Sequence, residues 1–311
     1  MNGLELARDF YAHCRPLLQA ALGDIWDKAC VGLVGEGSEC FGLDDALSRD
    51  HDFGPCFCLW LDEAILEREK QRIQAALAGL PESFAGYRSR LLDAERLGRV
   101  GALATERFYR FFLGRSSVPE TYREWLAIAE DQLACSTNGE IFEEHASLFS
   151  EIRRQLLCFY PREILLTKLA ASCLTMAQAG QYNYPRSLAR GEAAAAFFAL
   201  SRFAESALAF VYLINGRYRP FYKHAARLAK QLPLFGERIT KLLSLICEVK
   251  ESKDEEEIME GIEDFAQACA NYLREQGLSR LAGNWLWDQA GEIMGHVHDK
   301  FLRSQNLLRL T

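Results

Sequence analysis

The pattern of apolar residues changes near residue 145, and this change limits the folds open to the chain. Before it, apolar runs of strand length alternate with glycine-rich turns and amphipathic stretches. After it, long segments with helical periodicity follow one another and strand-length runs become rare. Strands and helices followed by helices alone are typical of an α+β region joined to a helical one. We therefore predict an α+β fold: a small mixed-sheet domain at residues 1–145, followed by an all-α helical-bundle domain at residues 146–311.

The first half carries two clear strand patterns. Residues 31–34 and 55–61 are apolar runs bounded by glycine and proline, which indicates buried strands. Amphipathic helices are expected at 3–22 and 62–78. Asn138-Gly139 predicts a β-hairpin, because this dipeptide is the strongest short hairpin signal. Further segments are expected at 84–91 and 99–105 as strands and at 106–113 as a helix.

The second half predicts seven helices. They are expected at residues 148–159, 161–179, 192–214, 221–232, 237–249, 255–276 and 284–303. The most apolar of them contains Arg202 and Glu205, which makes it a poor membrane span. We expect a buried helix and no membrane-bound protein.

Charge and cysteine content exclude some classes of protein. The 311 residues carry 36 Lys and Arg against 43 Asp and Glu, a formal net charge of -7. This acidic balance argues against a broad nucleic-acid-binding surface, although a local basic site stays open. Ten cysteines are scattered through apolar segments without a Cys-x-x-Cys pair, as expected for free thiols. Because the N-terminus also lacks a signal-peptide pattern, we expect a cytoplasmic protein.

A glycine- and acid-rich stretch between the first two strands carries the candidate chemistry. Gly37 has no Cβ to obstruct a phosphate, and Ser38 offers a hydroxyl and an amide. Asp50 and Asp52 are two residues apart, so in an extended backbone their carboxylates point to the same face. Such carboxylates repel each other unless a cation lies between them. Mg²⁺ prefers oxygen ligands and keeps substrate phosphates in its shell, so it suits this pair.

Other interpretations of this stretch stay open. From the pattern alone, a metal site at Asp50 and Asp52 and a plain acidic turn are equally supported. His51 points to the opposite face and is interpreted as a structural residue. Asp44 and Asp45 are interpreted as a helix cap or as solvated turn residues.

Three segments resemble a known superfamily. Gly37-Ser38 followed by Asp50-His51-Asp52 before an apolar strand resembles the signature of the DNA polymerase β-type nucleotidyltransferases. The longer string "GSECFGLDDALSRDHDFGP" resembles an uncharacterised bacterial family of nucleotidyltransferase-like proteins with a helical C-terminal half. Residues 189–203 and 215–233 resemble two further markers of that family, so the resemblance reaches both halves of the chain.

The resemblance implies a nucleotidyltransferase. It implies that Gly37 and Ser38 hold the β- and γ-phosphates of a nucleoside triphosphate, and that Asp50 and Asp52 hold Mg²⁺. The reaction moves a nucleoside monophosphate to an acceptor hydroxyl and releases pyrophosphate. We take ATP as the donor on its abundance alone. The implied helical half closes the cleft, as in aminoglycoside nucleotidyltransferases.

One departure from the superfamily pattern concerns a third acid. Many members carry one on a later strand as a metal ligand or general base. Residues 99–105 contain none, although Glu106 follows them, and Asp93 and Glu95 lie in an uncertain loop. Glu192 is a candidate base, against the plainer interpretation of a helix N-terminal residue favoured by the macrodipole. Without a third acid, the protein is a nucleotide-binding regulatory or partner-binding module that has lost catalysis.

A basic segment in the second half offers further ligand contacts. Arg219 and Lys223 are candidates for binding the triphosphate, and Tyr218 for stacking on the base. Arg190, in the polar loop expected before the long apolar helix, is a candidate for binding the acceptor. The alternative is a solvated basic stripe with aromatic core anchors.

The acceptor itself is not fixed by these residues. An aminoglycoside-like small molecule, an RNA end and a protein hydroxyl are all compatible with the pattern. A protein acceptor corresponds to an antitoxin-type nucleotidyltransferase that modifies a partner. The acidic net charge leans away from RNA.

Overall fold

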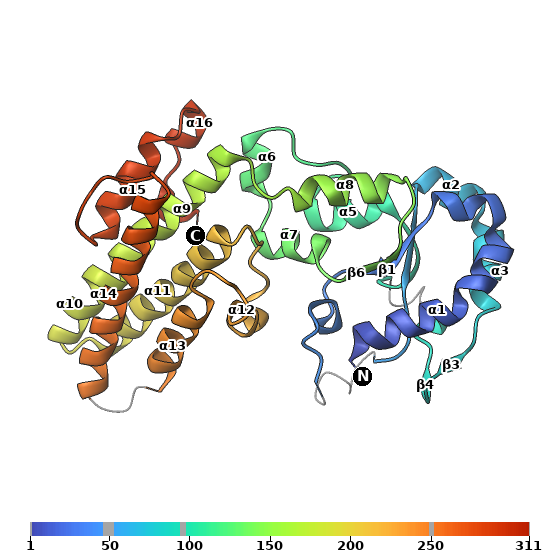
Figure 1. Cartoon of the computed structure of the whole chain (residues 1–311), viewed down its shortest axis with the longest axis horizontal. Helices are drawn as coiled ribbons and strands as arrows, with labels where there is room; N and C mark the ends of the chain where they lie inside the picture. Colours follow the sequence, from blue (N-terminus) through green and yellow to red (C-terminus); the bar gives the residue numbers. More distant parts are fainter. Residues whose placement is uncertain (1, 46–52, 94–97, 249–251, 311) are drawn as a thin grey trace. The chain divides into compact units, whose positions relative to one another are not determined.

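The chain forms two compact units. The computed structural model in Figure 1 describes residues 2–45, 53–93, 98–248 and 252–310. The first unit contains Met1–Pro119 and Ile128–Cys158, and the second contains Glu120–Ala127 and Phe159–Thr311. The first unit thus extends past residue 145 through Cys158. The predicted domain boundary stays a prediction.

The fold class is α+β, as predicted. The first unit holds a four-stranded sheet in the order β5-β2-β1-β6. Its strands are β1 (Cys30–Leu33), β2 (Cys58–Leu61), β5 (Gly101–Ala104) and β6 (Glu140–Glu143). Strand β1 is antiparallel to β2 and β6, whereas β2 is parallel to β5. In the described part of the second unit, the regular elements are all helical.

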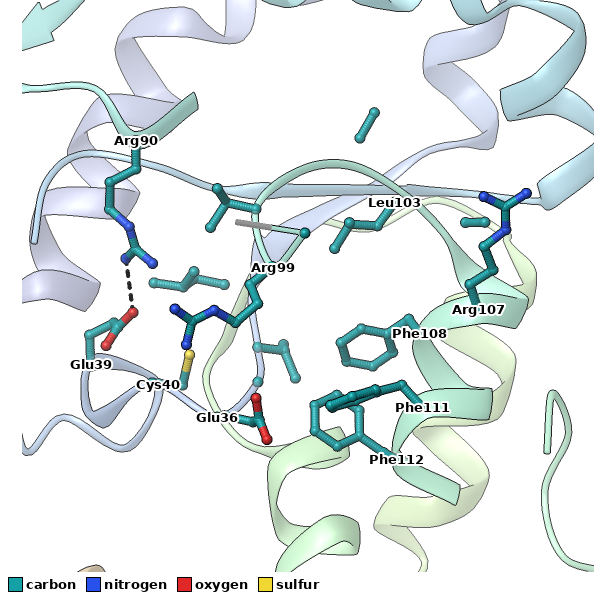
Figure 2. A pocket seen from close by; sticks show the side chains of 18 of the residues that line it. Glu36, Glu39, Cys40, Arg90, Arg99, Leu103, Arg107, Phe108, Phe111 and Phe112 are labelled. Carbon is teal, nitrogen blue, oxygen red and sulfur yellow. Dashed lines mark hydrogen bonds and ion pairs between the residues drawn. The ribbon is translucent and has the colours of Figure 1, made fainter. Parts of the chain in front are cut away.

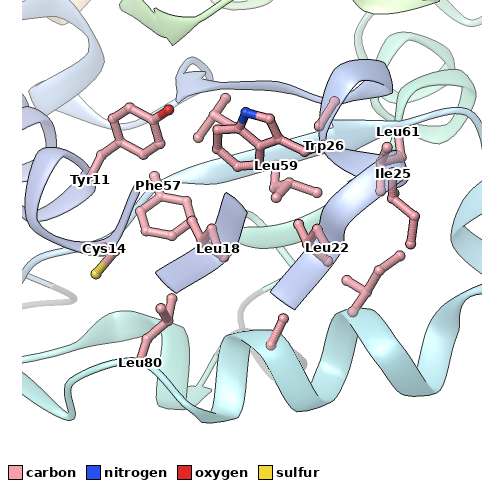
Figure 3. Close-up of a cluster of buried hydrophobic side chains, with 14 of the residues drawn as sticks. Tyr11, Cys14, Leu18, Leu22, Ile25, Trp26, Phe57, Leu59, Leu61 and Leu80 are labelled. Carbon is pink, nitrogen blue, oxygen red and sulfur yellow. The ribbon is translucent and has the colours of Figure 1, made fainter. Parts of the chain in front are cut away.

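Side-chain alternation along β2 builds two cores. Leu59 and Leu61 join a cluster with Phe10, Leu18 and other apolar residues from the N-terminal helix, and Figure 3 shows this cluster. Trp60 points to the opposite face, where its ring stacks on Phe149 at a centroid distance of 4.0 Å. Both faces are therefore covered, which explains why every residue of β2 is buried.

The helices of the first unit agree with the sequence pattern in most places. They are α1 (Gly3–Leu22), η1 (Gly23–Lys28), η2 (Ser38–Phe41), α2 (Glu63–Arg68), α3 (Lys70–Ala78), η4 (Arg90–Asp93), α5 (Thr105–Leu113), α7 (Glu130–Thr137) and α8 (Leu148–Leu157). Helix α1 begins with a capping box between Asn2 and Glu5. The expected helix over 62–78 is divided at Glu69 into α2 and α3.

Two expectations for the first unit are wrong in detail. The strand expected over 84–91 is instead a small hairpin of β3 (Ser83–Phe84) and β4 (Tyr87–Arg88). Asn138-Gly139 does not connect two strands: it ends helix α7 and leads into β6. Here Asn138 is extended and only Gly139 takes the left-handed conformation, which glycine adopts readily just after a helix. The sequence pattern alone did not separate these two uses.

The second unit is a helical bundle. Its elements are α6 (Tyr122–Ala127), α9 (Arg162–Met176), η5 (Ala177–Asn183), α10 (Tyr184–Ala189), α11 (Ala193–Ile214), α12 (Tyr222–Ala229), α13 (Gly236–Cys247), α14 (Ser252–Glu275), α15 (Leu286–Gly295), α16 (Lys300–Arg303) and η6 (Leu307–Arg309). Helix α9 packs against α11 and α15. The polar loop expected before α11 is wrong, because residues 177–189 form η5, a π-helical turn, and then α10.

Helix α11 is the most apolar element. By length and composition alone it could cross a membrane, which is weak evidence because core helices pass the same test. Phe203 and Phe210 are fully buried within the bundle. Gly180 of η5 leaves room for the ring of Phe203, which an added Cβ would overlap. This packing explains why a helix with so few polar residues belongs to a bundle.

All ten cysteines lie among the described residues and are free thiols. Eight of them are buried, and burial raises the pKa of thiols such as Cys14, to about 11. The eight buried cysteines are small apolar core residues.

Candidate functional site

The glycine-rich turn lies at one end of the sheet. Because β1 is antiparallel to β2, with Gly32 opposite Cys58, the end of β1 lies beside the start of β2. Because β5 is parallel to β2, with Gly101 opposite Cys58, its start lies at the same end. The turn after β1 and the segment before β5 therefore lie at the same end of the sheet's strands.

A cavity of about 580 Å³ opens at this end (Figure 2). Its volume is in the range of small-molecule sites. Most residues that line it come from the turn after β1, from β5 and the segment before it, and from helix α5, with Leu66 of α2 and Arg90 of η4 in addition. The charged and aromatic lining residues are Glu36, Glu39, Arg90, Arg99, Arg107, Phe108, Phe111 and Phe112.

The turn is held in place by residues distant in sequence. The side-chain amide of Asn138 donates to the carbonyl of Gly35 at 2.7 Å, and its oxygen accepts the Gly35 N–H at 3.0 Å. Arg153 in turn donates to the carbonyl of Asn138 at 2.9 Å. Gly139 has a φ of 65°, and an added Cβ would overlap the carbonyl oxygen of Leu33. These contacts fix the backbone that precedes Gly37.

An internal carboxylate lies directly over Gly37. The φ of Gly37 is -64°, so any residue could adopt its backbone conformation. An added Cβ would instead overlap the carboxylate of Glu39. The guanidinium of Arg90 donates to Glu39 at 3.0 Å, and the two side chains are only 10% and 18% exposed. A side chain at position 37 would thus require the Glu39 carboxylate, the end of a flexible side chain, to move from its place beside Arg90.

Ser38 begins the short helical turn η2, and its carbonyl accepts the N–H of Leu43. Asp44 accepts the backbone N–H of Gly3 at 2.7 Å and so caps α1. This contact agrees with the structural role expected for Asp44, although the helix it caps is distant in sequence. Asp45 is exposed.

Cationic and aromatic side chains occupy different parts of the cavity. Figure 2 shows Arg90 and Arg99 near the turn and the three phenylalanines of α5 on the other side. Phe108 and Phe112 are packed edge to face at 5.0 Å, and Phe111 is 66% exposed. The guanidinium of Arg107 forms ion pairs with the carboxylates of Glu63 and Glu67, with N···O distances of 2.6 and 3.0 Å. The cavity can accordingly receive a ligand with an anionic part and a flat apolar part.

The predicted metal ligands, Asp50 and Asp52, lie outside the described residues, as does His51. The chain resumes at Phe53 and reaches Pro55, whose carbonyl accepts the N–H of Arg90 at 3.0 Å. Among the residues that the structure describes, no group of three or more His, Cys, Asp or Glu side chains could hold a metal ion. The fit of Mg²⁺ therefore rests on the oxygen donors of the two aspartates.

The described candidates for a third acid in the first unit are Glu106, at the other end of the sheet, and Asp93, in an ion pair. Glu106 follows β5, at the opposite end of the sheet from the turn, and accepts the N–H of Glu63 at 2.8 Å. Burial, with the charge of Glu106, raises the pKa of the neighbouring Asp62. Asp93 pairs with Arg88. Glu95 lies outside the described residues.

Arg190 and Glu192 lie at adjoining helix ends in the second unit. Arg190 is the C-cap of α10 and Glu192 the N-cap of α11, and both are exposed. The N–H of Glu192 donates to the carbonyl of Ser187 at 2.9 Å, and its side chain makes no capping hydrogen bond. Its position agrees with the helix-terminal interpretation, and a role as base stays a prediction.

The three candidates in the basic segment differ in exposure. Tyr218 is 8% exposed, and its ring packs against Phe159 and Tyr160 at 4.8 and 5.0 Å. Arg219 donates to the carbonyl of Glu205 at 3.1 Å, whereas Lys223 is exposed. Tyr218 thus has the packing of a core side chain. Its stacking on a nucleotide base stays a prediction.

Sequence reasoning missed several cavity residues. Arg90 and Arg99 flank an unassigned loop, and the phenylalanines of α5 have the pattern of ordinary core residues. Asn138 was interpreted as a hairpin residue. Their proximity to the turn depends on strand order and register, which no local pattern records.

Comparisons with known proteins give limited matches. A family model described as "Domain of unknown function (DUF4037)" matches residues 125–225. No curated protein matches the chain. A solved structure, described as a nucleotidyltransferase-like protein from Exiguobacterium sibiricum 255-15, is 12% identical, with 92% of this chain and 90% of that chain covered. The TM-score is 0.35.

Proposed function

We propose that the protein is a Mg²⁺-dependent nucleotidyltransferase that moves a nucleoside monophosphate from a nucleoside triphosphate, taken as ATP, to an acceptor hydroxyl. The observation that carries the proposal is the cavity beside the Gly35–Ser38 turn, with Arg90, Arg99 and two glutamates at one side, one of them paired with Arg90, and phenylalanines at the other. A nucleotide has this division between charged phosphates and a flat base. The Asp50-x-Asp52 pattern adds the ligands for a cation.

In this proposal each group of residues has a separate task. Arg90 and Arg99 bind phosphate oxygens, and the Gly37-Ser38 backbone supports them. Phe108 and Phe111 offer ring faces for the base. Mg²⁺, held by the two aspartates, would neutralise charge on the phosphates.

The chemical step is an in-line displacement. The acceptor hydroxyl oxygen bonds to the α-phosphorus while the bond from that phosphorus to the bridging oxygen breaks, and pyrophosphate leaves. The hydroxyl proton goes to a general base. Small molecules, RNA ends and protein hydroxyls all present a suitable group.

A transfer assay tests the proposal. Radiolabelled triphosphates are incubated with Mg²⁺ and candidate acceptors, and the variants D50N and D52N are compared with wild type. Each variant should lose transfer by about a hundredfold or more, because one neutral ligand weakens the metal site. D45N, which changes an exposed aspartate in the same stretch, serves as a matched control and should retain activity. Transfer that persists in both D50N and D52N would contradict the metal site.

A second candidate function is supported by one observation. Strand β5, the parallel neighbour of β2, contains no acid, and Glu106 lies at the far end of the sheet. A chain without the third acid would bind nucleotide with Mg²⁺ and release no pyrophosphate. Calorimetry together with a pyrophosphate assay separates the two: pyrophosphate release that depends on Asp52 contradicts the binding module.

A further inference from the structure

Positive charge is concentrated in one part of the second unit. Residues 206–236 contain five Lys and Arg residues and no Asp or Glu, in a chain whose formal net charge is -7. Four of these cations are exposed: Arg217, Lys223, Arg227 and Lys230. The segment is therefore a local reversal of the sign of the protein's charge.

Helix α12 aligns three of these cations. Lys223, Arg227 and Lys230 are separated by four and three residues, which places them on one side of a helix. Ala225 and Ala229, 1% and 0% exposed, lie on the side that faces the bundle. We call Lys223, Arg227 and Lys230 the basic stripe; it spans about 10 Å along the axis, at 1.5 Å per residue.

Two aromatic rings lie exposed at the start of the stripe. Phe221 and Tyr222 are 44% and 76% exposed, and their centroids are 4.3 Å apart. Tyr218, three residues earlier, is buried in the core. Tyr218 is therefore an aromatic core residue, whereas Phe221 and Tyr222 are not. Exposed ring faces beside several cations are a recurring feature of single-strand binding surfaces.

The field of the stripe acts on a neighbouring side chain. Burial lowers the pKa of His224, and the charges of Lys223 and Arg227 lower it further. The cations thus disfavour additional positive charge at this position. By the same physics they attract anions to the exposed side of α12.

We propose that Phe221, Tyr222 and the basic stripe form a binding surface for single-stranded nucleic acid. The cations bind backbone phosphates and the rings stack on unpaired bases. A duplex hides its base faces, and an acidic peptide offers no regular series of flat rings, so a single strand uses both features best. This surface is local, and it goes beyond the proposed transferase activity without requiring it.

Fluorescence anisotropy tests this surface. The probe is a labelled single-stranded RNA of about 15 nucleotides, with the same sequence as DNA and as a duplex for comparison. Wild-type protein should bind the single strands at about 50 mM salt and release them as salt rises. With three to four phosphates neutralised, the logarithm of the binding constant should fall with a slope of about -2 to -3 against the logarithm of salt concentration.

Variants assign the binding to these residues. Y222A should weaken binding about tenfold, whereas Y222F should keep most of it, because the ring face is retained. K223E should weaken binding about tenfold or more and make the salt slope shallower. Two matched controls change exposed residues elsewhere in the second unit: F197A, at a side chain 67% exposed, and K300E. Both should bind as wild type.

Three results would overturn the proposal. The first is no binding of single strands at about 50 mM salt, where phosphate contacts are strong. The second is an equal loss of affinity in the controls and in Y222A and K223E. The third is tighter binding of an acidic peptide or of anionic lipid vesicles than of RNA, which would assign the surface to another partner.

Discussion

Of the Asn-Gly pairs in the chain, Asn138-Gly139 in the first unit and Asn215-Gly216 in the second make the same kind of contacts in different surroundings. Asn138 ends helix α7 and binds the N–H and carbonyl of Gly35 at 3.0 and 2.7 Å. Asn215 ends helix α11 and binds the N–H and carbonyl of Leu234 at 3.0 and 2.8 Å. In each pair the asparagine amide holds a distant backbone segment in place.

The glycines of the two pairs show how the surroundings differ. Gly139 and Gly216 have φ values of 65° and 61°. A Cβ on Gly139 would overlap Leu33, whereas a Cβ on Gly216 would meet nothing within 4 Å. The first pair thus fixes a turn within a packed cavity wall, and the second fixes the ends of an exposed basic segment. The hydrogen bonds of the two asparagines are alike. The two regions differ in the side chains of the backbone segment that each asparagine binds.

The largest expected difference concerns these two glycines. G139A should destabilise the first unit by about 3 kcal/mol or more, because it combines a left-handed φ with overlap against the strand β1 backbone. G216A should cost only about 1 kcal/mol, from the φ alone. Urea unfolding of both variants measures this difference. Equal losses would show that the cavity wall adjusts freely around Gly139.

The two asparagines should differ in ligand binding rather than in stability. N138A removes two side-chain hydrogen bonds and N215A three, one of them to Val211 in its own helix, so each should lower the free energy of unfolding by about 2 to 3 kcal/mol. Only N138A should also weaken the binding of an ATP analogue, because it releases the Gly35–Ser38 turn. Calorimetry on the folded variants checks this. A similar loss of nucleotide affinity in N215A would remove the distinction.

A smaller effect is expected at the ion pair in the cavity. The carboxylate of Glu39 occupies Arg90, so E39Q should free that guanidinium and tighten triphosphate binding about threefold. D24N, which changes the exposed partner of Arg72 and lies outside the cavity lining, is the control and should leave the affinity unchanged. Titration with tripolyphosphate in place of ATP separates phosphate binding from base binding. Weaker binding by E39Q would instead assign Glu39 a direct role in holding the ligand.

The smallest effect is a pH dependence in the basic segment. The pKa of His224 lies below its usual 6.5, because of burial and of Lys223 and Arg227. As pH falls through 6.5, the unfolded chain binds a proton that the folded chain does not. The free energy of unfolding should therefore fall as pH is lowered, and H224Q should remove this part of the pH profile. An unchanged profile in H224Q would show that His224 titrates normally.

The fold was largely predictable from local patterns. The helical half follows from periodicity, and most of its helices were located within a few residues. The wrong predictions concern sequence patterns that are compatible with two different structures. Asn138-Gly139 suits a hairpin or a helix end, and the polar segment before α11 contains helix-compatible residues that pack against the bundle.

The candidate site was predictable only in part. The Gly37-Ser38 turn stands out in the sequence, whereas the position of the Glu39 carboxylate over Gly37 is visible only in the structure. Arg90, Arg99 and Phe111 reach the cavity through strand order and register, which depend on long-range pairing. The same holds for Asp44, which caps a helix about forty residues earlier in the chain.

The most direct test of the central claim is a crystal structure of the protein with a nonhydrolysable ATP analogue and Mg²⁺. The structure should show phosphates between the Gly37-Ser38 turn and Arg90 and Arg99, a metal ion between Asp50 and Asp52, and the base against Phe108 or Phe111. A nucleotide bound away from this cavity, or a metal ion that neither aspartate contacts, would contradict the claim.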